Sequence, residues 1–389
     1  MSFFSGWNGW RQFRKLPWDW RNIVIYSESG QDWHQFSGLI EQLNGPLGRK
    51  VCYISSDTMD PGLAREHENY RAICIPEGLF LTIFFQVNQS DVFVLTMMDL
   101  QNLQLKRSTY PVHYIYLFHS MGSTHMVDNE NSFDHYESLF CAGPHQVKEI
   151  RRREELQGLP AKHLFDYGHP RLEEVIREGK NCQTQKSPGE PVTILIAPTW
   201  GETSIFNTCG KELIGVLLDS GYRVIMRPHY QSNRQTPGII AAVRDAFLGK
   251  EHFEYIDRMG ETDSVMRSDI LVNDWSAMAL EYSMGLEKPV LFIDVPRRIR
   301  NPHWRDLEIQ PIENTIRKQI GEIVSPGSLQ DAPAAIERLV GNPERFREKV
   351  QELRNSVVFR LGHSVTDGAV EVARLADERA ALRSEREDE

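Results

Sequence analysis

The sequence predicts an α/β fold of two domains, each built on a doubly wound parallel sheet. Short apolar runs of strand length alternate with segments of helical pattern along most of the 389 residues. The runs are almost continuously apolar, which is typical of parallel strands covered by helices on both faces. The alternation stops in a polar, turn-rich segment at residues 177–191 and then begins again. Two domains joined by a linker account for this pattern, and the chain is long enough for both.

The apolar runs of the first half predict the strands of the first sheet. They comprise residues 22–26, 51–54, 72–75, 91–95, 112–117, 137–142 and 164–167. Residues 33–43 and 145–157 carry the pattern of helices that lie among these strands. We expect this first domain to span residues 22–180.

After the linker, the same alternation predicts a second domain at residues 190–345. Its expected strands are residues 192–197, 222–226, 253–256, 269–273 and 289–293, and residues 210–220 are expected to form a helix. Residues 346–389 are expected to form a C-terminal helix and a charged tail. Beyond Asp377 charged residues dominate, so this tail is expected to be a frayed helix or unstructured.

Composition argues against nucleic acid as a partner and indicates an intracellular setting. The formal net charge is −10, whereas binding many phosphates requires a large basic surface. Five cysteines lie without the spacing of a metal or redox motif, which fits a reducing compartment with unpaired thiols. No apolar stretch reaches the roughly 18–20 residues needed to cross a bilayer. We therefore expect a cytoplasmic protein.

Residues 1–21 form an N-terminal arm rich in aromatic and basic side chains. Its first twenty residues contain four Trp and three Phe, interspersed with basic residues. Aromatic rings combined with basic groups suit a membrane interface, so peripheral contact of residues 1–20 with the inner face of the cell membrane is one interpretation. The alternative is an arm that packs its aromatic side chains against its own domain. Gly9 and Pro17 predict only a short helix in either case.

Polar residues follow directly on four of the predicted strands. In open parallel sheets ligands bind outside the carboxyl ends of the strands, so these residues are candidate site residues. They are His119 and Ser120 after residues 112–117, Thr199 after 192–197, Arg227 and His229 after 222–226, and Asp274, Trp275 and Ser276 after 269–273. Their convergence on one edge, rather than any single residue, indicates a site.

The residues of the second domain suit a ligand that carries phosphate groups. Arg227 offers a planar fork to phosphate oxygens, and His229 can donate a hydrogen bond to phosphate or exchange a proton near neutral pH. Ser276 opens a helix whose free N–H groups favour an anion. Glu281, farther along this helix, is placed to bind ribose hydroxyls.

Each of these residues also has a structural interpretation. Asp274 or Ser276 can cap its helix, which is the commonest function of such residues at that position. Arg227 and His229 can belong to a solvated turn, and Glu281 can be a surface charge.

Several motifs occur together in the order and spacing of a known enzyme family. They are Ala197-Pro198-Thr199-Trp200, Arg227-Pro228-His229, residues 268–276 (SDILVNDWS), Glu281-Tyr282 and residues 288–292 (KPVLF). This combination resembles the CDP-glycerol glycerophosphotransferase family, which makes teichoic acids and related capsular polymers, over residues 112–295. Two positions depart from the family pattern. Ser120 instead of Gly follows His119, and Asp-Tyr-Ser-Ser is replaced by residues 274–277 (DWSA).

The resemblance implies a GT-B fold, in which two Rossmann-like domains face each other across a cleft. It implies transfer of an alditol phosphate, such as glycerol phosphate, from a CDP-linked donor to a hydroxyl of a glycan or lipid-linked glycan in cell-surface polysaccharide synthesis. By analogy, His119 is the base that takes the proton of the acceptor hydroxyl, and His229 with Arg227 contacts the donor phosphates. The diphosphate pocket would be lined by Thr199, Asp274, Trp275 and Ser276.

The segment FHSMGSTH, residues 118–125, is the expected acceptor loop of the first domain. It leaves a core strand and is predicted to aim His119 into the cleft, with Gly122 allowing the backbone to turn closely. Acceptor hydroxyls are expected to bind Ser120, Ser123 and Thr124. His125 is instead expected to be a loop residue that is hydrogen-bonded to the backbone.

A second polar segment, residues 168–171 (GHPR), follows the strand at residues 164–167. Gly168 is expected to allow close approach to the donor. Arg171 is expected to pair with its own helix or with a phosphate.

We expect neither a metal nor a cofactor, and the CDP-linked donor is a substrate. Acidic pairs spaced for Mg²⁺ are absent from the predicted site, and Arg227, His229 and helix N–H groups can neutralise a diphosphate. Two other functions stay open. A GT-B glycosyltransferase that uses a nucleotide sugar would share the cleft, and a non-enzymatic glycan-binding protein would not need two facing histidines. A nucleotide-sugar epimerase is less favoured, because no acidic set is placed for proton abstraction.

Overall fold

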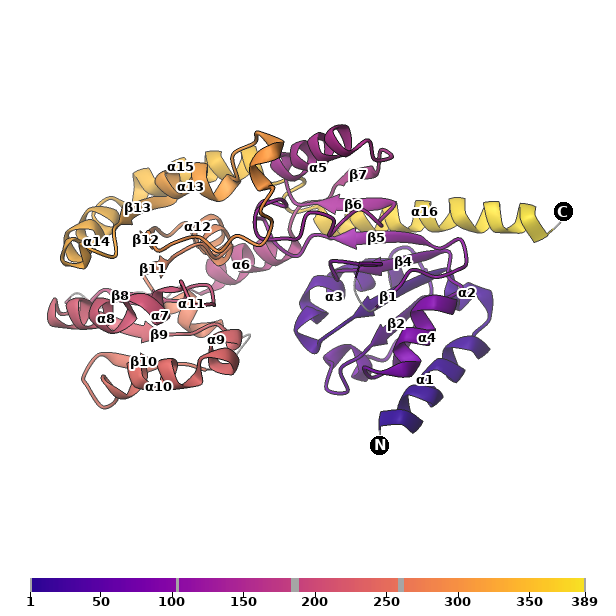
Figure 1. Cartoon of the computed structure of the whole chain (residues 1–389), viewed down its shortest axis with the longest axis horizontal. Coiled ribbons are helices and arrows are strands. Elements are labelled where there is room, and N and C mark those ends of the chain that lie inside the picture. Colours follow the sequence, from indigo (N-terminus) through magenta and orange to yellow (C-terminus); the bar gives the residue numbers. More distant parts are fainter. Residues whose placement is uncertain (1, 103–104, 183–188, 258–261, 388–389) are drawn as a thin grey trace.

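The computed structural model describes residues 2–102, 105–182, 189–257 and 262–387, which form two α/β domains (Figure 1). Each domain has one sheet of parallel strands with helices on both faces. This arrangement confirms the predicted fold class.

The first sheet has seven strands in the order β3-β2-β1-β4-β5-β6-β7. They are β1 (Ile23–Ser27), β2 (Val51–Ser55), β3 (Tyr70–Cys74), β4 (Val92–Leu95), β5 (His113–Leu117), β6 (Ser138–Cys141) and β7 (His163–Asp166). Val24 and Tyr26 face the core under helix α4 (Leu79–Val87), whereas Ile23 and Ile25 face α3 (Trp33–Asn44). The chain reverses its direction of sheet growth between β1 and β4, which is the position where doubly wound sheets bind ligands.

The second sheet has six strands in the order β10-β9-β8-β11-β12-β13. They are β8 (Thr193–Ile196), β9 (Arg223–Met226), β10 (Phe253–Tyr255), β11 (Ile270–Asn273), β12 (Val290–Ile293) and β13 (Gly321–Val324). The edge strand β13 was not predicted. It is short, begins with Gly321 and is only partly buried, so it lacks the apolar run that marks the other strands.

Helices cover both faces of this second sheet. One face carries α8 (Gly210–Asp219), α10 (Pro237–Asp245) and α14 (Ala332–Val340). The other carries α12 (Met278–Leu286), α13 (Ile312–Ile320) and α15 (Pro343–Val357). Short helices elsewhere are α2 (Trp18–Arg21), α7 (Ile205–Thr208), α9 (Tyr230–Gln235) and α11 (Asp263–Arg267), and the first domain also contains α5 (Pro144–Gln157).

The N-terminal arm forms a helix, α1 (Ser2–Lys15), that packs against α4 and β3. The prediction of a short helix was therefore wrong. Gly9 is tolerated because a β-carbon there would lie 2.2 Å from the carbonyl oxygen of Cys74, so only glycine lets the helix approach β3 this closely. Phe13 is buried, but Phe4 and Trp7 are 74% and 40% exposed, so the arm packs only part of its aromatic surface against its own domain.

The C-terminal segment returns to the first domain as one long helix, α16 (Ser364–Glu387) (Figure 1). Its residues Ala369, Val372 and Ala376 are fully buried in the core that contains α3. Arg383 also pairs with the buried Asp91 at 2.9 Å. The expected frayed or unstructured tail after Asp377 was therefore wrong, because these contacts fix the charged half of the helix.

A close helix crossing links the two domains. Helix α6 (Pro170–Asn181) follows β7 and lies against α12 of the second domain (Figure 1). Gly285 on α12 faces Val175 on α6, and a β-carbon on Gly285 would lie 2.4 Å from Val175 Cγ1. The absence of a side chain at Gly285 thus sets how closely the helices approach.

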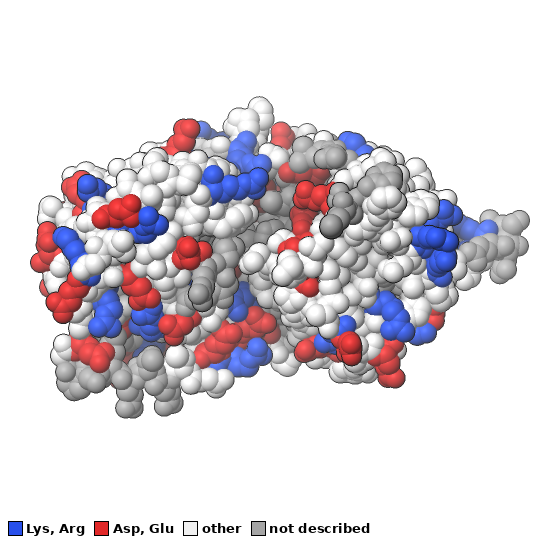
Figure 2. All heavy atoms as spheres, turned by 90° about the horizontal axis from the view of Figure 1, so that it is seen from below, with Lys and Arg blue, Asp and Glu red and all other residues white. Residues whose placement is uncertain are grey.

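The charges of the surface are mixed rather than segregated on the face shown in Figure 2. Lysine and arginine side chains lie among aspartates and glutamates there. Among the described residues, no helix combines the length and the apolar character that a membrane crossing requires.

Gly285→Ala is expected to lower the free energy of unfolding by about 1–3 kcal/mol, because the added methyl group overpacks the α6–α12 crossing. Urea denaturation measures the change. Gly238→Ala on α10 is the control, since a β-carbon there meets no described atom within 4 Å. Equal effects of the two substitutions would contradict a tight crossing.

Candidate active site

The carboxyl end of β5 and the start of α6 bring histidines of the first domain toward α12 of the second. His119 follows β5 directly, as predicted, and the hydroxyl of Tyr116 lies 3.3 Å from its Nδ1. Burial lowers the pKa of His119 to about 4, and His169 and His34 nearby contribute to this shift. His119 is therefore neutral at pH 7, which is the form that a general base requires.

His169 and Glu281 form a contact between the domains. His169 precedes α6 and is fully buried, and its Nε2 lies 3.2 Å from Glu281 Oε1 on α12. Burial opposes ionisation of Glu281, but the hydrogen bond and charge of His169, with Arg171, outweigh it and lower the pKa of the carboxyl. Glu281 is thus ionised and held by His169, while its side chain stays 25% exposed.

The sequence analysis missed the contact of His169, although it noted the polar segment that contains it. The partner, Glu281, is 112 positions away in the chain, so no local pattern connects the two. Arg171 pairs with Glu174 at 3.0 Å along its own helix, which was one of its two predicted contacts.

In the second domain, His229 lies in a cluster of rings and arginines. It follows Arg227 at the end of β9, and its Nδ1 accepts a hydrogen bond from the backbone N–H of Gln231 at 3.2 Å. The imidazole is nearly parallel to the indole of Trp200. Burial lowers the pKa of His229 to about 4, and the charge of Arg298 contributes to this shift.

Arginines that follow β12 add positive charge to this part of the site, and the sequence analysis did not select them. The guanidinium of Arg298 lies 3.5 Å from the centroid of the Trp200 ring. Arg297 and Arg317 lie over the ring of Trp275 at 4.3 and 3.8 Å. Stacking on the indoles fixes these cations at low entropic cost. The signal was visible in residues 297–300 (RRIR), which come shortly after a strand.

The residues predicted to line a diphosphate pocket mainly shape the loops around it. Asp274 is fully buried, and its Oδ1 accepts hydrogen bonds from the N–H groups of Thr199 and Trp275, both at 2.7 Å. Ser276 Oγ accepts from the N–H of Met278 at 3.3 Å, close to the start of α12. Asp274 therefore ties the loop after β8 to the start of α12, and Ser276 fits the capping interpretation. Thr199 and Trp275 stay partly exposed.

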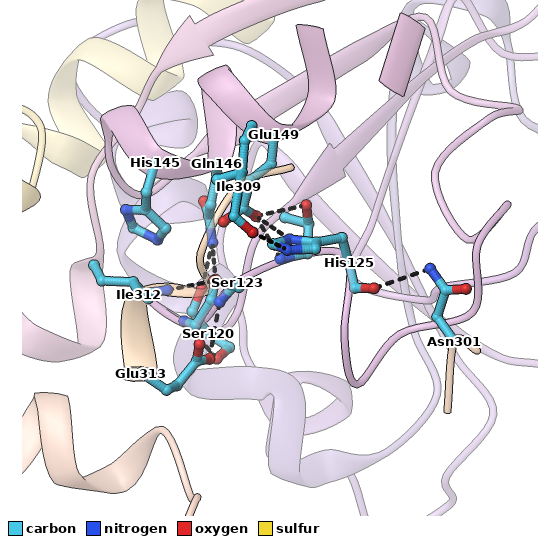
Figure 3. Close-up of polar contacts among 12 residues, drawn as sticks. Ser120, Ser123, His125, His145, Gln146, Glu149, Asn301, Ile309, Ile312 and Glu313 are labelled. Carbon is cyan, nitrogen blue, oxygen red and sulfur yellow. Dashed lines mark hydrogen bonds and ion pairs between the residues drawn. The ribbon is translucent and has the colours of Figure 1, made fainter. Parts of the chain in front are cut away.

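The loop at residues 118–125, predicted to bind the acceptor, is anchored to the second domain (Figure 3). Ser123 donates its N–H to Glu313 Oε1 at 2.9 Å, and its Oγ accepts from the N–H of Ile312 at 2.7 Å. The N–H and the hydroxyl of Thr124 both donate to Glu149 Oε2. Ser123 and Thr124 are almost fully buried, so the predicted acceptor contacts are left to the half-exposed Ser120.

His125 has the backbone contact that was expected. Its Nε2 lies 3.1 Å from the carbonyl oxygen of Ile309, and its Nδ1 lies 3.3 Å from Glu149 Oε2. Burial opposes protonation, but the hydrogen bond and charge of Glu149 outweigh it and raise the pKa of His125. This buried pair therefore fastens the loop and is not a base for catalysis.

The described residues contain no group of three or more His, Cys, Asp or Glu side chains able to hold a metal ion.

Two doubly wound domains with parallel sheets, in contact through α6 and α12, define a GT-B type of fold. Residues 114–296 match the model of the family described as CDP-Glycerol:Poly(glycerophosphate) glycerophosphotransferase, which confirms the resemblance seen in the motifs. The matched segment contains His119, Arg227, His229 and residues 274–276.

Solved structures of similar fold include a variant of the Wall Teichoic Acid Polymerase TagF, at 14% identity and a TM-score of 0.59, covering 93% of this chain and 90% of that one. A second structure of this TagF variant, soaked with CDPG, matches equally well. The UDP-GlcNAc 2-epimerase from Methanocaldococcus jannaschii is similar at 12% identity and a TM-score of 0.52, covering 86% of this chain and 99% of that one. At these identities the likeness establishes the fold. No curated protein sequence matches the chain.

His119 and His229 are expected to titrate near pH 4 rather than near the usual 6.5. As the pH falls, the histidines of the unfolded chain are protonated near pH 6.5, before those of the folded protein. Their contribution to the free energy of unfolding is therefore fully present above pH 6.5 and is lost as the pH falls toward 4. Histidine-ring NMR measures the pKa values, and His119→Gln and His229→Gln assign the signals. A ring that titrates near 6.5 would contradict the burial argument for that residue.

Proposed function

We propose that the chain transfers glycerol phosphate, or a similar alditol phosphate, from a CDP-linked donor to a hydroxyl of a glycan or lipid-linked glycan in cell-surface polysaccharide synthesis. The observation that carries this proposal is the family match, because its segment contains His119 of the first domain as well as Arg227 and His229 of the second. These groups come from opposite domains, as a two-substrate transfer requires. An enzyme of this kind needs one half to hold the donor and the other to activate the acceptor.

In the proposed reaction, the acceptor oxygen attacks the phosphorus that bears the glycerol. A new P–O bond forms, the bond between the two phosphates breaks, and CMP leaves with the bridging oxygen. His119 takes the proton of the acceptor hydroxyl, since it is neutral at pH 7. The ring contact with Tyr116 keeps the imidazole in one orientation.

The donor is held in this proposal by the second domain. Arg227 and Arg298 are the cations that neutralise the diphosphate, and His229 donates a hydrogen bond to it. Glu281 is the proposed partner of the ribose, with His169 holding its carboxylate in place. Phosphoryl transfer depends mainly on positioning and charge stabilisation, which fixed, stacked arginines supply. We propose that these cations replace a metal ion and that the enzyme uses no cofactor.

Calorimetry with CDP, CDP-glycerol, CDP-ribitol and UDP tests the donor. The wild type is expected to prefer the CDP compounds, and Arg227→Ala is expected to weaken their binding by about tenfold or more, because a charged hydrogen bond to phosphate is lost. All titrations contain EDTA, so binding that appears only after Mg²⁺ is added would contradict metal independence.

Arg244→Ala is the matched control, since Arg244 lies on α10 and pairs with its neighbour Asp245. Selective binding of UDP would instead indicate a glycosyltransferase that binds a nucleotide sugar in the cleft and transfers the sugar. Failure of every nucleotide to bind would favour a glycan-binding protein without enzymatic activity.

We also propose that α1 rests on the membrane at its cytoplasmic face, where a lipid-linked acceptor would lie. Phe4 and Trp7 on α1 and Leu79 at the start of α4 are large, exposed apolar side chains. Trp7 lies 5.5 Å from Phe80, so the two helices share one apolar surface. Arg11 and Lys15 on the same helix are exposed and suit anionic lipid headgroups.

The double substitution Phe4→Ser/Trp7→Ser is expected to reduce co-sedimentation with anionic liposomes several-fold, because it removes apolar surface that would enter the interface. Leu248→Ser is the control, since Leu248 is 67% exposed but lies in the second domain. Binding that is unchanged in the double variant would remove α1 from the proposal.

A further inference from the structure

A cavity of about 520 Å³ lies in the first domain, outside the contacts described above. It is lined by residues that follow three strands, namely Glu28 after β1, Glu77 and Gly78 after β3, and Met97 and Met98 after β4. Strands β1 and β4 are the neighbours between which the sheet reverses its direction of growth. The cavity therefore lies where the topology of the sheet favours a ligand, and its volume suits a small organic group.

The lining combines an apolar wall with carboxyl groups. Tyr26, Leu81 and Met97 are buried behind it, whereas Glu28 and Glu77 are exposed at the cavity. Neither carboxyl group has a hydrogen bond or an ion pair with the described residues. The surrounding protein desolvates the carboxyl group of Glu28 and raises its pKa to about 7. The charges of Asp32 and Glu77 contribute to this rise. Both carboxyl groups thus have acceptor capacity that the described residues do not use.

The same cavity is connected to the proposed base. Burial raises the pKa of Tyr116 well above its usual value, and the negative charges of Asp128 and Glu28 add to the rise. Met97 of the lining accepts a hydrogen bond from the hydroxyl of Tyr136. The ring centroids of Tyr136 and Tyr116 lie 5.3 Å apart, and the Tyr116 hydroxyl lies 3.3 Å from His119 Nδ1. On the opposite side, Gly78 lines the cavity and Leu79 belongs to the exposed apolar surface of α1 and α4. The lining of the cavity thus shares contacts with the aromatic residues beside the proposed base and adjoins the start of α4.

We propose that this cavity binds the end of the acceptor, and that this end is an uncharged, hydroxyl-rich sugar rather than a chain of glycerol phosphate. The inference rests on the proposed function and names the class of acceptor for it. Each carboxyl can accept hydrogen bonds from two sugar hydroxyls, and the methionines can pack against the C–H face of a pyranose ring. A phosphate at the same position would face two carboxyl groups and be repelled by them in their ionised form.

This selectivity has a consequence for the number of units added. After one transfer, the acceptor carries a phosphodiester next to its new terminal hydroxyls. That anion would have to enter the cavity of Glu28 and Glu77 before a second transfer. The enzyme would therefore add one unit to a neutral glycan instead of extending its own product.

An array that carries neutral glycans and glycerol phosphate oligomers tests the inference with the full chain. The wild type is expected to bind neutral glycans and not the oligomers. Glu28→Gln/Glu77→Gln is expected to bind the neutral glycans about tenfold more weakly, because charge-assisted hydrogen bonds become neutral ones, and to discriminate less against the oligomers. Glu251→Gln is the control, since the side chain of Glu251 is 90% exposed in the second domain.

Three outcomes would overturn the inference: wild-type binding of the oligomers as strong as that of neutral glycans, no binding to any member of the array, or an unchanged double variant. Calorimetry with CDP-glycerol on the same samples separates this test from that of the function. The double variant is expected to keep donor binding, which shows that it is folded. If the wild type does not bind CDP-glycerol, the result counts against the proposed function. The array reports on the acceptor cavity alone.

Discussion

The anchoring of residues 118–125 on the second domain is the contact on which the site depends. The loop carries His119 at its beginning and is fastened a few residues later by Ser123 to Glu313 and by His125 to Ile309. Asn301 adds a hydrogen bond to the carbonyl oxygen of His125 at 2.9 Å. One short segment thus both carries the proposed base and joins the domains. A base placed this way keeps its position relative to the opposite half, which transfer between two bound substrates requires.

Charge is arranged in the site by burial and stacking more than by ion pairs. His119 and His229 are neutral because protein surrounds them, whereas arginines 297, 298 and 317 stay charged on the faces of two tryptophans. An indole face leaves the edges of a guanidinium directed outward as hydrogen-bond donors. Trp200 and Trp275 therefore act as supports for cations, which gives a physical reason for aromatic residues in both loops.

The sequence contains the strands and the residues at their ends, but not the contacts between distant segments. Buried parallel strands are marked by apolar runs, and His119 and Arg227 follow such runs directly, so both could be located locally. The pair of His169 and Glu281 could not, because it exists only when α6 crosses α12. The length of α1 was misjudged for a similar reason, since Gly9 serves a close approach to β3 that the local sequence does not reveal.

Helix α16 makes the first domain depend on the last part of the chain. Its buried residues, Ala369, Val372, Leu375 and Ala376, complete the core on one face of the first sheet, next to α3. During synthesis the first sheet emerges with that face bare, and the cover arrives only after the whole second domain has been made. Until α16 has been synthesised, the apolar surface that it covers on β1 and β4 stays exposed to other chains. The order of synthesis and the order of packing therefore differ, and the protein closes its first domain last.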